Sequence, residues 1–394
     1  MEGNRRRALL IVWPPGIAGL VLAAGMAHAV EPAIVRLNDG RPIISQQSFL
    51  DAGAEFAAQG ANINGPSLIR VPDWISPADR PHPEARYYLY FADHNGAFIR
   101  MAWAAKVDGP YALFGQHALA EGKPRGVLDL GSRRRKPLGN GLELRGHVAS
   151  PDVRVDNKLR RIEMIFHAPT YHNGASIGQK SFVAVSSDGL DFNRGIEPVV
   201  LGFAYFRVFE WAGGLYAVAG RGALYKARDS ANPFTAPADF DYSKELWLPQ
   251  GANPSDNPFQ KAIDAARTAG ELPAAVERAR HFAVEATEAG GLRFLYTRVG
   301  DAPERILASC VAQPAADFAQ WEPSFPPQQW LRPRLPWEGA DEPNVPSRAG
   351  AARGLIHQLR DPYVFRDIDG RRYLLYSGGG ERGIGIAEIK SSEP

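Results

Sequence analysis

A repeated unit is the feature that most constrains the fold of this 394-residue chain. Each copy has an apolar strand, a Gly- or Asp-containing turn, an aromatic-rich strand, a polar loop and a third strand. Such a unit is typical of one four-stranded antiparallel blade, and blades stacked around an axis leave only short, protected edges. The corresponding positions of five copies are Pro66, Pro151, Phe206, Phe282 and Pro362.

Five copies predict an all-β protein, a five-bladed β-propeller. The high content of Gly (40) and Pro (32) and the scarcity of helical periodicity favour β structure. A β-sandwich whose turns coincide by chance is the alternative fold. Two further segments have predicted places: residues 256–279 form a short helical insertion before blade four, and residues 33–44 pair with the last blade and close the ring.

The first 29 residues have the features of a signal peptide. Three consecutive arginines precede an apolar stretch, and Ala27-His28-Ala29 offers small residues at a cleavage site. The apolar stretch is short and broken by Pro and Gly, which argues against the alternative of a membrane anchor. We therefore expect an exported protein, periplasmic or secreted, with no membrane attachment after signal removal and with residues 30–394 as a single domain.

Charge and cysteine content limit the partners and cofactors. A formal net charge of +2 argues against nucleic acid as a partner bound through bulk charge. Cys310 is the only cysteine, so no disulfide can form within the chain. The histidines are too scattered for a metal motif, and no cofactor is predicted, although one ion bound by His147 and His281 in the central channel stays open. The sequence leaves the oligomeric state undetermined.

Propeller geometry sorts the polar residues by face. The inner strands start at one face, and the loops between the second and third strands return to it, so their polar residues converge on one funnel mouth. A concave site lined by carboxylates, His and Arg is the default ligand-site hypothesis. Arginines such as Arg221 and Arg305 are expected at this mouth, and their guanidinium groups suit carboxylate, sulfate or phosphate, although blade-to-blade ion pairs would account for them equally.

The motif series RDPYVF, DG, YLLYS and GIGIA, with SPDV and SSDGLDF in the second unit, resembles the five-bladed propeller glycosidases of glycoside hydrolase family 43 and its relatives. The resemblance implies an Asp-Pro in the first blade as base, an Asp in the second that tunes the pKa and a Glu in the third as acid. Here the second blade offers Asp152, whereas the first has Asn64 and Gly65 and the third has Arg207. The Asp-Pro occurs in the fifth blade, at Asp361.

The prediction is therefore a glycoside hydrolase acting on a polysaccharide-derived oligosaccharide, with an acidic or sulfated sugar as one candidate. Glycosidic hydrolysis needs one carboxyl group to protonate the leaving oxygen and a second to activate water. The predicted catalytic residues are Asp152, Asp361, Glu304 and Glu381. The predicted substrate-binding residues are Asn64, Asp93, His94, His147, Arg207, His281, Arg305 and Arg360.

Two other functions stay open at this point. The missing family carboxylates favour a non-catalytic glycan-binding propeller. A uronic-acid lyase on the same fold would use His or Tyr as base near Arg. In all three cases the expected partner is a carbohydrate.

Overall fold

The computed structural model describes residues 33–115, 117–118, 124–250, 257–315 and 317–390. The predicted signal peptide, residues 1–29, lies outside the described residues. Within the described ranges, no helix is long and apolar enough to cross a membrane.

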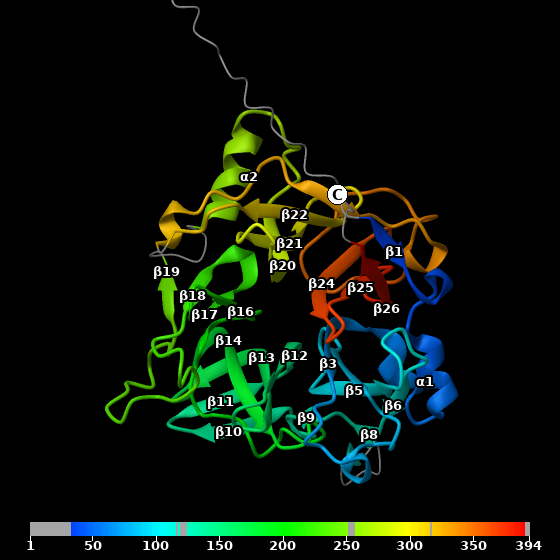
Figure 1. Cartoon of the computed structure of the whole chain (residues 1–394), viewed down its shortest axis with the longest axis vertical. Helices are drawn as coiled ribbons and strands as arrows, with labels where there is room; N and C mark the ends of the chain where they lie inside the picture. Colours follow the sequence, from blue (N-terminus) through cyan, green and yellow to red (C-terminus); the bar gives the residue numbers. More distant parts are fainter. Residues whose placement is uncertain (1–32, 116, 119–123, 251–256, 316, 391–394) are drawn as a thin grey trace, which may run out of the picture. The chain divides into compact units, whose positions relative to one another are not determined.

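Five antiparallel sheets surround a common centre (Figure 1). The strand of each sheet nearest the centre packs against the inner strands of its neighbours: β3 contacts β12 and β24, and β20 contacts β16 and β24. These inner strands are β3 (Asn64–Arg70), β12 (Ala149–Asp156), β16 (Arg207–Trp211), β20 (Arg278–Ala286) and β24 (Leu359–Arg366). The predicted five-bladed propeller is confirmed.

The first two blades carry additional short strands. Blade 1 continues from β3 through β4 (Tyr87–Ala92), β5 (Phe98–Ala104) and β6 (Ala112–Phe114), and β9 (Leu128–Asp129) also pairs with β5. Blade 2 continues from β12 through β13 (Arg161–His172), β14 (Ala175–Ser186) and β15 (Gly202–Phe203). Strands β10 (Arg135–Gly139) and β11 (Leu142–Arg145) extend blade 2, and β7 (His117–Ala118) pairs with β8 (Pro124–Arg125).

The third and fourth blades are separated by a helix. Blade 3 continues from β16 through β17 (Gly214–Val218), β18 (Leu224–Lys226) and β19 (Leu248–Gln250). Blade 4 continues from β20 through β21 (Leu292–Val299), β22 (Ile306–Val311) and β23 (Gln328–Leu331). Helix α2 (Pro258–Thr268) lies between them in sequence, which confirms the predicted helical insertion before blade four.

Helix α2 begins and packs as its sequence dictates. Asn257 is its N-cap and accepts a hydrogen bond from the Gln260 backbone N–H, while Pro258 occupies the first turn, where no N–H is needed. Phe259 and Ile263 are buried, and both belong to the apolar cluster of blades 3 and 4. The insertion is therefore fixed to the propeller through one apolar face.

Blade 5 is completed by residues from the beginning of the described chain. It runs from β24 through β25 (Arg372–Gly378) and β26 (Gly383–Ile389) to β1 (Ile34–Arg36), and β2 (Ile44–Ser45) also pairs with β26. The predicted pairing of residues 33–44 with the last blade is thus confirmed. Helix α1 (Gln46–Ala52) follows, and short 3-10 helices lie at Asn38–Gly40, Ala57–Ala61, Pro77–Asp79, Gly220–Gly222, Phe318–Gln320 and Pro336–Glu338.

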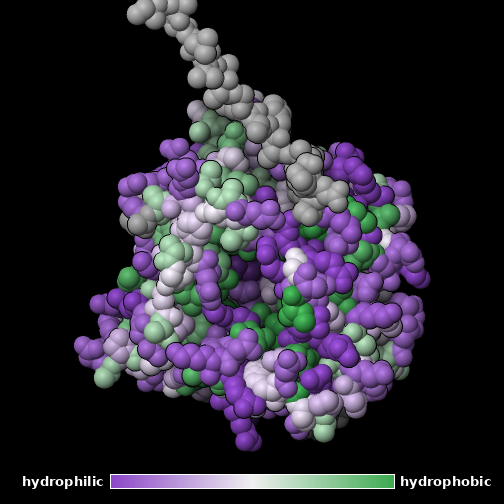
Figure 2. Space-filling view, in the orientation of Figure 1, coloured by the Kyte–Doolittle hydropathy of each residue, from purple (hydrophilic) through white to green (hydrophobic). Residues whose placement is uncertain are grey.

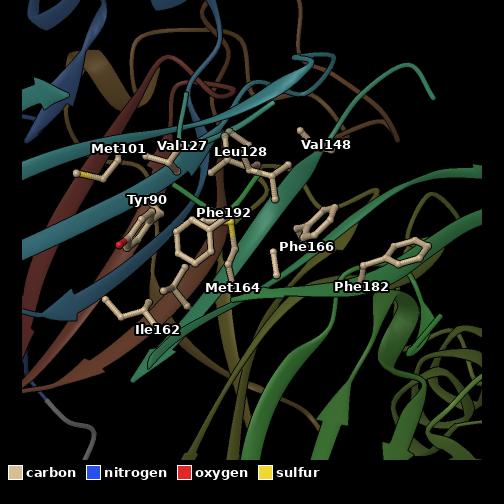
Figure 3. Close-up of a cluster of buried hydrophobic side chains, with 14 of the residues drawn as sticks. Tyr90, Met101, Val127, Leu128, Val148, Ile162, Met164, Phe166, Phe182 and Phe192 are labelled. Atoms are coloured by element: carbon tan, nitrogen blue, oxygen red, sulfur yellow. The ribbon is translucent and has the colours of Figure 1, made fainter. Parts of the chain in front are cut away.

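Apolar side chains fill the space between neighbouring blades. Between blades 1 and 2, Tyr90, Phe166 and Phe182 are at most 1% exposed and belong to one continuous cluster (Figure 3). The Tyr90 hydroxyl donates to the carbonyl of Gly189, so its burial leaves no unpaired polar group. Because buried aromatic rings dominate this packing, the blades provide a rigid frame for the polar residues at the funnel mouth.

Candidate functional site

Each blade places one residue with left-handed backbone at the mouth end of its inner strand. In four blades the strand pairing shifts register at this point, which is a β-bulge that redirects a side chain. Positive φ is unfavourable for residues other than Gly, and such strain is concentrated at functional sites. The five residues are Gly65 (φ 59°), Ser150 (φ 51°), Tyr205 (φ 69°), His281 (φ 55°) and Asp361 (φ 49°).

A pocket of about 360 Å³ opens beside this ring of bulges. Its walls combine imidazole, phenol and guanidinium groups with small residues. The lining residues are His94, Gln179, Phe203, Ala204, Tyr205, Gly220, Arg221, Arg278, Arg280, His281, Ala349 and Gly350. The predicted convergence of polar residues from several blades is therefore found for His94 and His281. In the space-filling view, hydrophilic residues border a hollow near the centre of the face shown (Figure 2).

His281 and Asp361 form the first histidine–carboxylate pair of the site. Nδ1 of His281 lies 3.1 Å from Oδ1 of Asp361, and both side chains are less than a tenth exposed. Neither Nδ1 of His281 nor Oδ2 of Asp361 has a hydrogen-bond partner among the described residues. Buried polar atoms are rarely left unpaired, so this pair is available for a substrate or a water molecule.

The environment shifts both groups of this pair towards their neutral forms. Burial, reinforced by the charge of Glu381, raises the pKa of Asp361 to about 6. Burial, together with the charge of Arg280, lowers the pKa of His281 well below its usual value. Arg360 is the neighbour of Asp361 in sequence, but its side chain donates to Glu381 and lies 3.4 Å from Glu304.

His94 and Glu381 form the second pair. Nδ1 of His94 lies 3.3 Å from Oε1 of Glu381, and Asn62 donates to the other carboxylate oxygen at 2.7 Å. Burial acts to lower the pKa of His94, but its hydrogen bond to Glu381 outweighs burial and raises it. Burial acts in turn to raise the pKa of Glu381, but His94 and Arg360 hold it at about 2. The raised pKa favours the protonated form of His94, whose side chain is 23% exposed at the pocket wall.

Glu304 is a completely buried anchor for two arginines. Arg280 donates to it through Nε at 2.8 Å and through a second nitrogen, and Thr297 donates at 2.7 Å. Arg360 lies 3.4 Å from Glu304 and also bonds Glu381, so it joins the two carboxylates. The charges of Arg280 and Arg360 outweigh burial and hold the pKa of Glu304 at about 2. Glu304 is therefore ionised, and it is paired with Arg280 and Arg360 rather than with Arg305, its neighbour in sequence.

Tyr205 lies between two histidine rings. Its ring centroid is 4.1 Å from that of His167 and 5.6 Å from that of His281, and the ring centroid of His147 lies 6.0 Å from that of His167. Burial raises the pKa of Tyr205 to about 12, so its phenol is neutral. His167 has no hydrogen-bond partner on either ring nitrogen among the described residues, and burial lowers its pKa well below the usual value.

Asp152 and Arg207 are buried on the inner strands of blades 2 and 3. Asp152 accepts a hydrogen bond from the backbone N–H of Val208 at 2.7 Å, and its other oxygen is 3.7 Å from Arg207. Arg207 donates to the carbonyls of Pro151 and Phe282 in the flanking blades. Burial raises the pKa of Asp152. No hydrogen bond or ion pair in the described ranges joins Asp152 to Asp361, and a catalytic role for Asp152 stays a prediction.

Three other predicted residues shape the loops of the mouth. Asn64 donates to the side-chain oxygen of Asn62, which holds Glu381. Asp93 accepts from the backbone N–H of Asn95 and so stabilises the turn that carries His94. Arg305 donates to the carbonyl of Pro303, and within the described part of the chain it has no hydrogen bond or ion pair with the carboxylates discussed above.

The prediction omitted Tyr205 and Arg278 from the site. Tyr205 had a recognisable signal, because each left-handed residue directly precedes one of the five corresponding positions used to align the blades. Arg278 had none, since only the folded blade brings it to the pocket. Among the residues that the structure describes, no group of three or more His, Cys, Asp or Glu is arranged to hold a metal ion.

Comparison with known proteins yields one sequence relative and several structures of the same fold. The chain is 30% identical over 335 residues to the uncharacterized protein R118 of Acanthamoeba polyphaga mimivirus, covering 83% of each chain. No protein-family profile matches. A glycosyl hydrolase from Bacteroides ovatus has a similar structure, with a TM-score of 0.53 at 12% identity over 92% of this chain and 95% of that one.

Two further structures share the architecture. A family-43 glycoside hydrolase described as thermostable has a TM-score of 0.50 at 14% identity, over 84% of this chain and 93% of that chain. A structure of the GH130 family, described as mannoside phosphorylases that include hydrolases of β-1,2-mannosidic linkages in Candida mannan, has a TM-score of 0.51 at 13% identity, over 92% and 95%. At these identities the likeness establishes the propeller fold.

Proposed function

Because this chain belongs to the family of mimivirus protein R118 and has the fold of the propeller glycosidases, we propose that it is a glycoside hydrolase acting on an oligosaccharide. One observation carries the proposal. Two histidine–carboxylate pairs meet at a single pocket, and their surroundings shift the pKa of His94 upward and that of His281 downward. Titratable groups whose pKa values are pushed apart mark the acid and the base of a hydrolytic site.

The proposed roles follow from these protonation states. His94, kept protonated by Glu381, donates its proton to the leaving glycosidic oxygen as the bond from the anomeric carbon to that oxygen breaks. His281 accepts a proton from the water whose oxygen bonds the anomeric carbon, and the Asp361 carboxylate stabilises the imidazolium that forms. In these roles, His94 replaces the carboxyl group that serves as acid in the family-43 pattern. His281, supported by Asp361, replaces the one that serves as base.

The pH dependence of kcat/KM tests this assignment. Activity should rise as pH increases through about 6, because Asp361 must be ionised to stabilise the imidazolium. It should fall again at a pH above 6.5, where His94 with its raised pKa loses its proton. A profile measured with wild type should therefore be bell-shaped, and His94→Gln should lack the alkaline limb. Activity that increases steadily from pH 7 to pH 4 would contradict these roles.

A uronic-acid lyase is the second candidate, because of the position of Tyr205. The neutral phenol of Tyr205 lies beside His281 and near Arg280. In a lyase reaction the phenol would protonate the leaving oxygen, while His281 would remove the proton from the carbon next to the neutralised carboxylate of the uronic acid. The two reactions give different products. Elimination creates an unsaturated, ultraviolet-absorbing sugar, whereas hydrolysis adds water to the products and creates no such chromophore.

Export is proposed on the sequence of residues 1–29 alone. A cleaved signal would leave a mature chain that begins at Val30. Sequencing the N-terminus of protein recovered from the periplasm or medium of an expressing bacterium tests this point. Protein that stays in the cytoplasm with residues 1–29 attached would contradict it.

A further inference from the structure

The pocket contains one guanidinium group that no acidic residue neutralises. Arg280 is bonded to Glu304, and Arg278 donates to Glu277 at 2.8 Å. Arg221, by contrast, is exposed at the pocket wall, and its side chain has no hydrogen bond or ion pair with any described residue. An unpaired cation in a wall of the pocket is therefore available to a ligand.

The backbone that carries Arg221 is strained. Arg221 has φ 66° in the middle of the Gly220–Gly222 turn, a left-handed conformation that a side chain with a Cβ disfavours. The turn is closed by hydrogen bonds between Ala219 and Ala223 and from Gly222 to Ala219. Glycine would adopt this conformation at lower cost, so the side chain at this position carries a conformational penalty.

The flanking glycines leave Arg221 as the only side chain of the turn. A Cβ atom on Gly222 would lie 2.9 Å from Oδ1 of Asn257, and one on Gly220 would lie 3.3 Å from the carbonyl oxygen of Ala204. The turn is thus closely packed on both sides, and the exposed Arg221 lies between two glycines at which a Cβ atom would crowd its neighbours.

Helix α2 holds this turn in place. Asn257 is 2% exposed, and its Nδ2 donates to the carbonyl of Arg221 at 3.0 Å while its Oδ1 caps the helix by accepting from Gln260. Phe259, in the first turn of the helix, packs against Phe282 of the inner strand that carries His281. The inserted helix therefore links the position of Arg221 to the position of the His281–Asp361 pair.

We propose that Arg221 binds an anionic group, a carboxylate or a sulfate, on the sugar that occupies the pocket. A guanidinium group matches the paired oxygens of either anion with two parallel N–H donors. The inference rests on the proposed function for the identity of the ligand as a sugar, and it specifies the substrate class. Asn257 is a positioning residue, because it acts on the ligand only through the Arg221 turn.

Binding can be tested separately from hydrolysis. Titration calorimetry with three disaccharides, one neutral, one carrying a uronate and one carrying a sulfate, compares wild type with Arg221→Gln. We expect wild type to bind one anionic probe at least about tenfold more tightly than the neutral one, and Arg221→Gln to lose that preference without losing affinity for the neutral probe. The anionic probe that binds more tightly, the uronate or the sulfate, identifies the group that Arg221 binds.

Arg160 provides a matched control. It is exposed, has left-handed backbone (φ 49°) and lies in the turn between β12 and β13, outside the pocket. Arg221→Gly and Arg160→Gly should both leave Tm unchanged or raised, because glycine relieves the backbone strain at either turn. Only Arg221→Gly should weaken binding of the anionic probe. A large fall in Tm for Arg221→Gly would show a structural role and overturn the proposal.

The remaining outcomes separate this inference from the proposed function. Equal affinity of wild type for all probes, or no detectable binding of an anionic one, would overturn the inference. Hydrolysis of anionic oligosaccharides unaffected by Arg221→Gln would do the same while leaving the proposed function in place. Binding of an anionic probe that depends on Arg221, with no hydrolysis, would support the inference and contradict the proposed function.

Discussion

Replacing Asp361 by Asn should lower kcat/KM by about 10² to 10⁴, the contribution typical of general acid–base catalysis. The substitution keeps the shape of the side chain but removes the negative charge 3.1 Å from Nδ1 of His281. The imidazolium that forms during proton removal then loses its stabilising partner. Rates of product release from an oligosaccharide substrate measure the effect, and circular dichroism checks that the variant is folded.

Asp369→Asn is the control for this experiment. Asp369 lies in the turn after the same inner strand, pairs with Arg371 at the surface and has a 40% exposed side chain. We expect the activity of this variant to match wild type. If Asp361→Asn is also fully active, the His281–Asp361 pair has no part in the reaction, and the acid–base roles assigned to the pocket are wrong.

Replacing Glu304 by Gln should reduce the free energy of unfolding by about 3–5 kcal/mol, as expected when one partner of a buried ion pair is removed. Glu304 is fully buried, and its loss of charge leaves Arg280 and Arg360 with an uncompensated positive charge between them. Urea denaturation followed by circular dichroism gives the measurement. Glu210→Gln removes an exposed partner of Arg154 and should cause no measurable change.

The same ion pairs predict how stability changes with pH. The pKa of Glu304 falls from 4.5 to about 2 on folding. A depressed folded-state pKa stabilises the native state above the unfolded pKa, and that contribution is lost as pH falls through the folded pKa. Wild type should therefore lose the Glu304 contribution between about pH 4.5 and pH 2, whereas Glu304→Gln should show a weaker dependence on pH in this range. An unchanged dependence would mean that Glu304 is not ionised in the folded protein.

Much of the fold could be predicted from the sequence because a propeller repeats its local pattern. Hairpin turns and alternating strands recur in each blade, so Pro66 and Pro362 could be aligned without knowledge of their neighbours in space. The closure by β1 and the helix before blade four followed from short patterns at the expected places.

The site was harder to predict because its pairs join distant segments. Glu304 is bonded to Arg280 and contacts Arg360, whereas its neighbour in sequence, Arg305, donates to the carbonyl of Pro303. His94 and Glu381 are separated by 287 positions and meet only when the ring closes. The position of a residue within its blade predicts whether it lies at the funnel mouth. Which residue it pairs with depends on the directions of side chains from different blades.

Sequence motifs explain why Asp361 stood out and Tyr205 did not. Asp361 precedes Pro362, so the sequence resembles the Asp-Pro of the family-43 pattern, whereas Tyr205 precedes Phe206 and matches no motif. The structure places both at the same position of their blades, with left-handed backbone. Equivalent geometry with different residues is what a fold permits when the chemistry at its mouth changes.

The most direct test of the account is mass spectrometry of the products formed from a panel of neutral, uronate-containing and sulfated oligosaccharides. The account predicts that wild type releases fragments whose combined mass exceeds that of the substrate by one water, and that Asp361→Asn and His94→Gln release far less. Fragments without added water would identify a lyase. Binding of a panel member without any release would contradict an enzymatic role and make the protein a glycan-binding propeller.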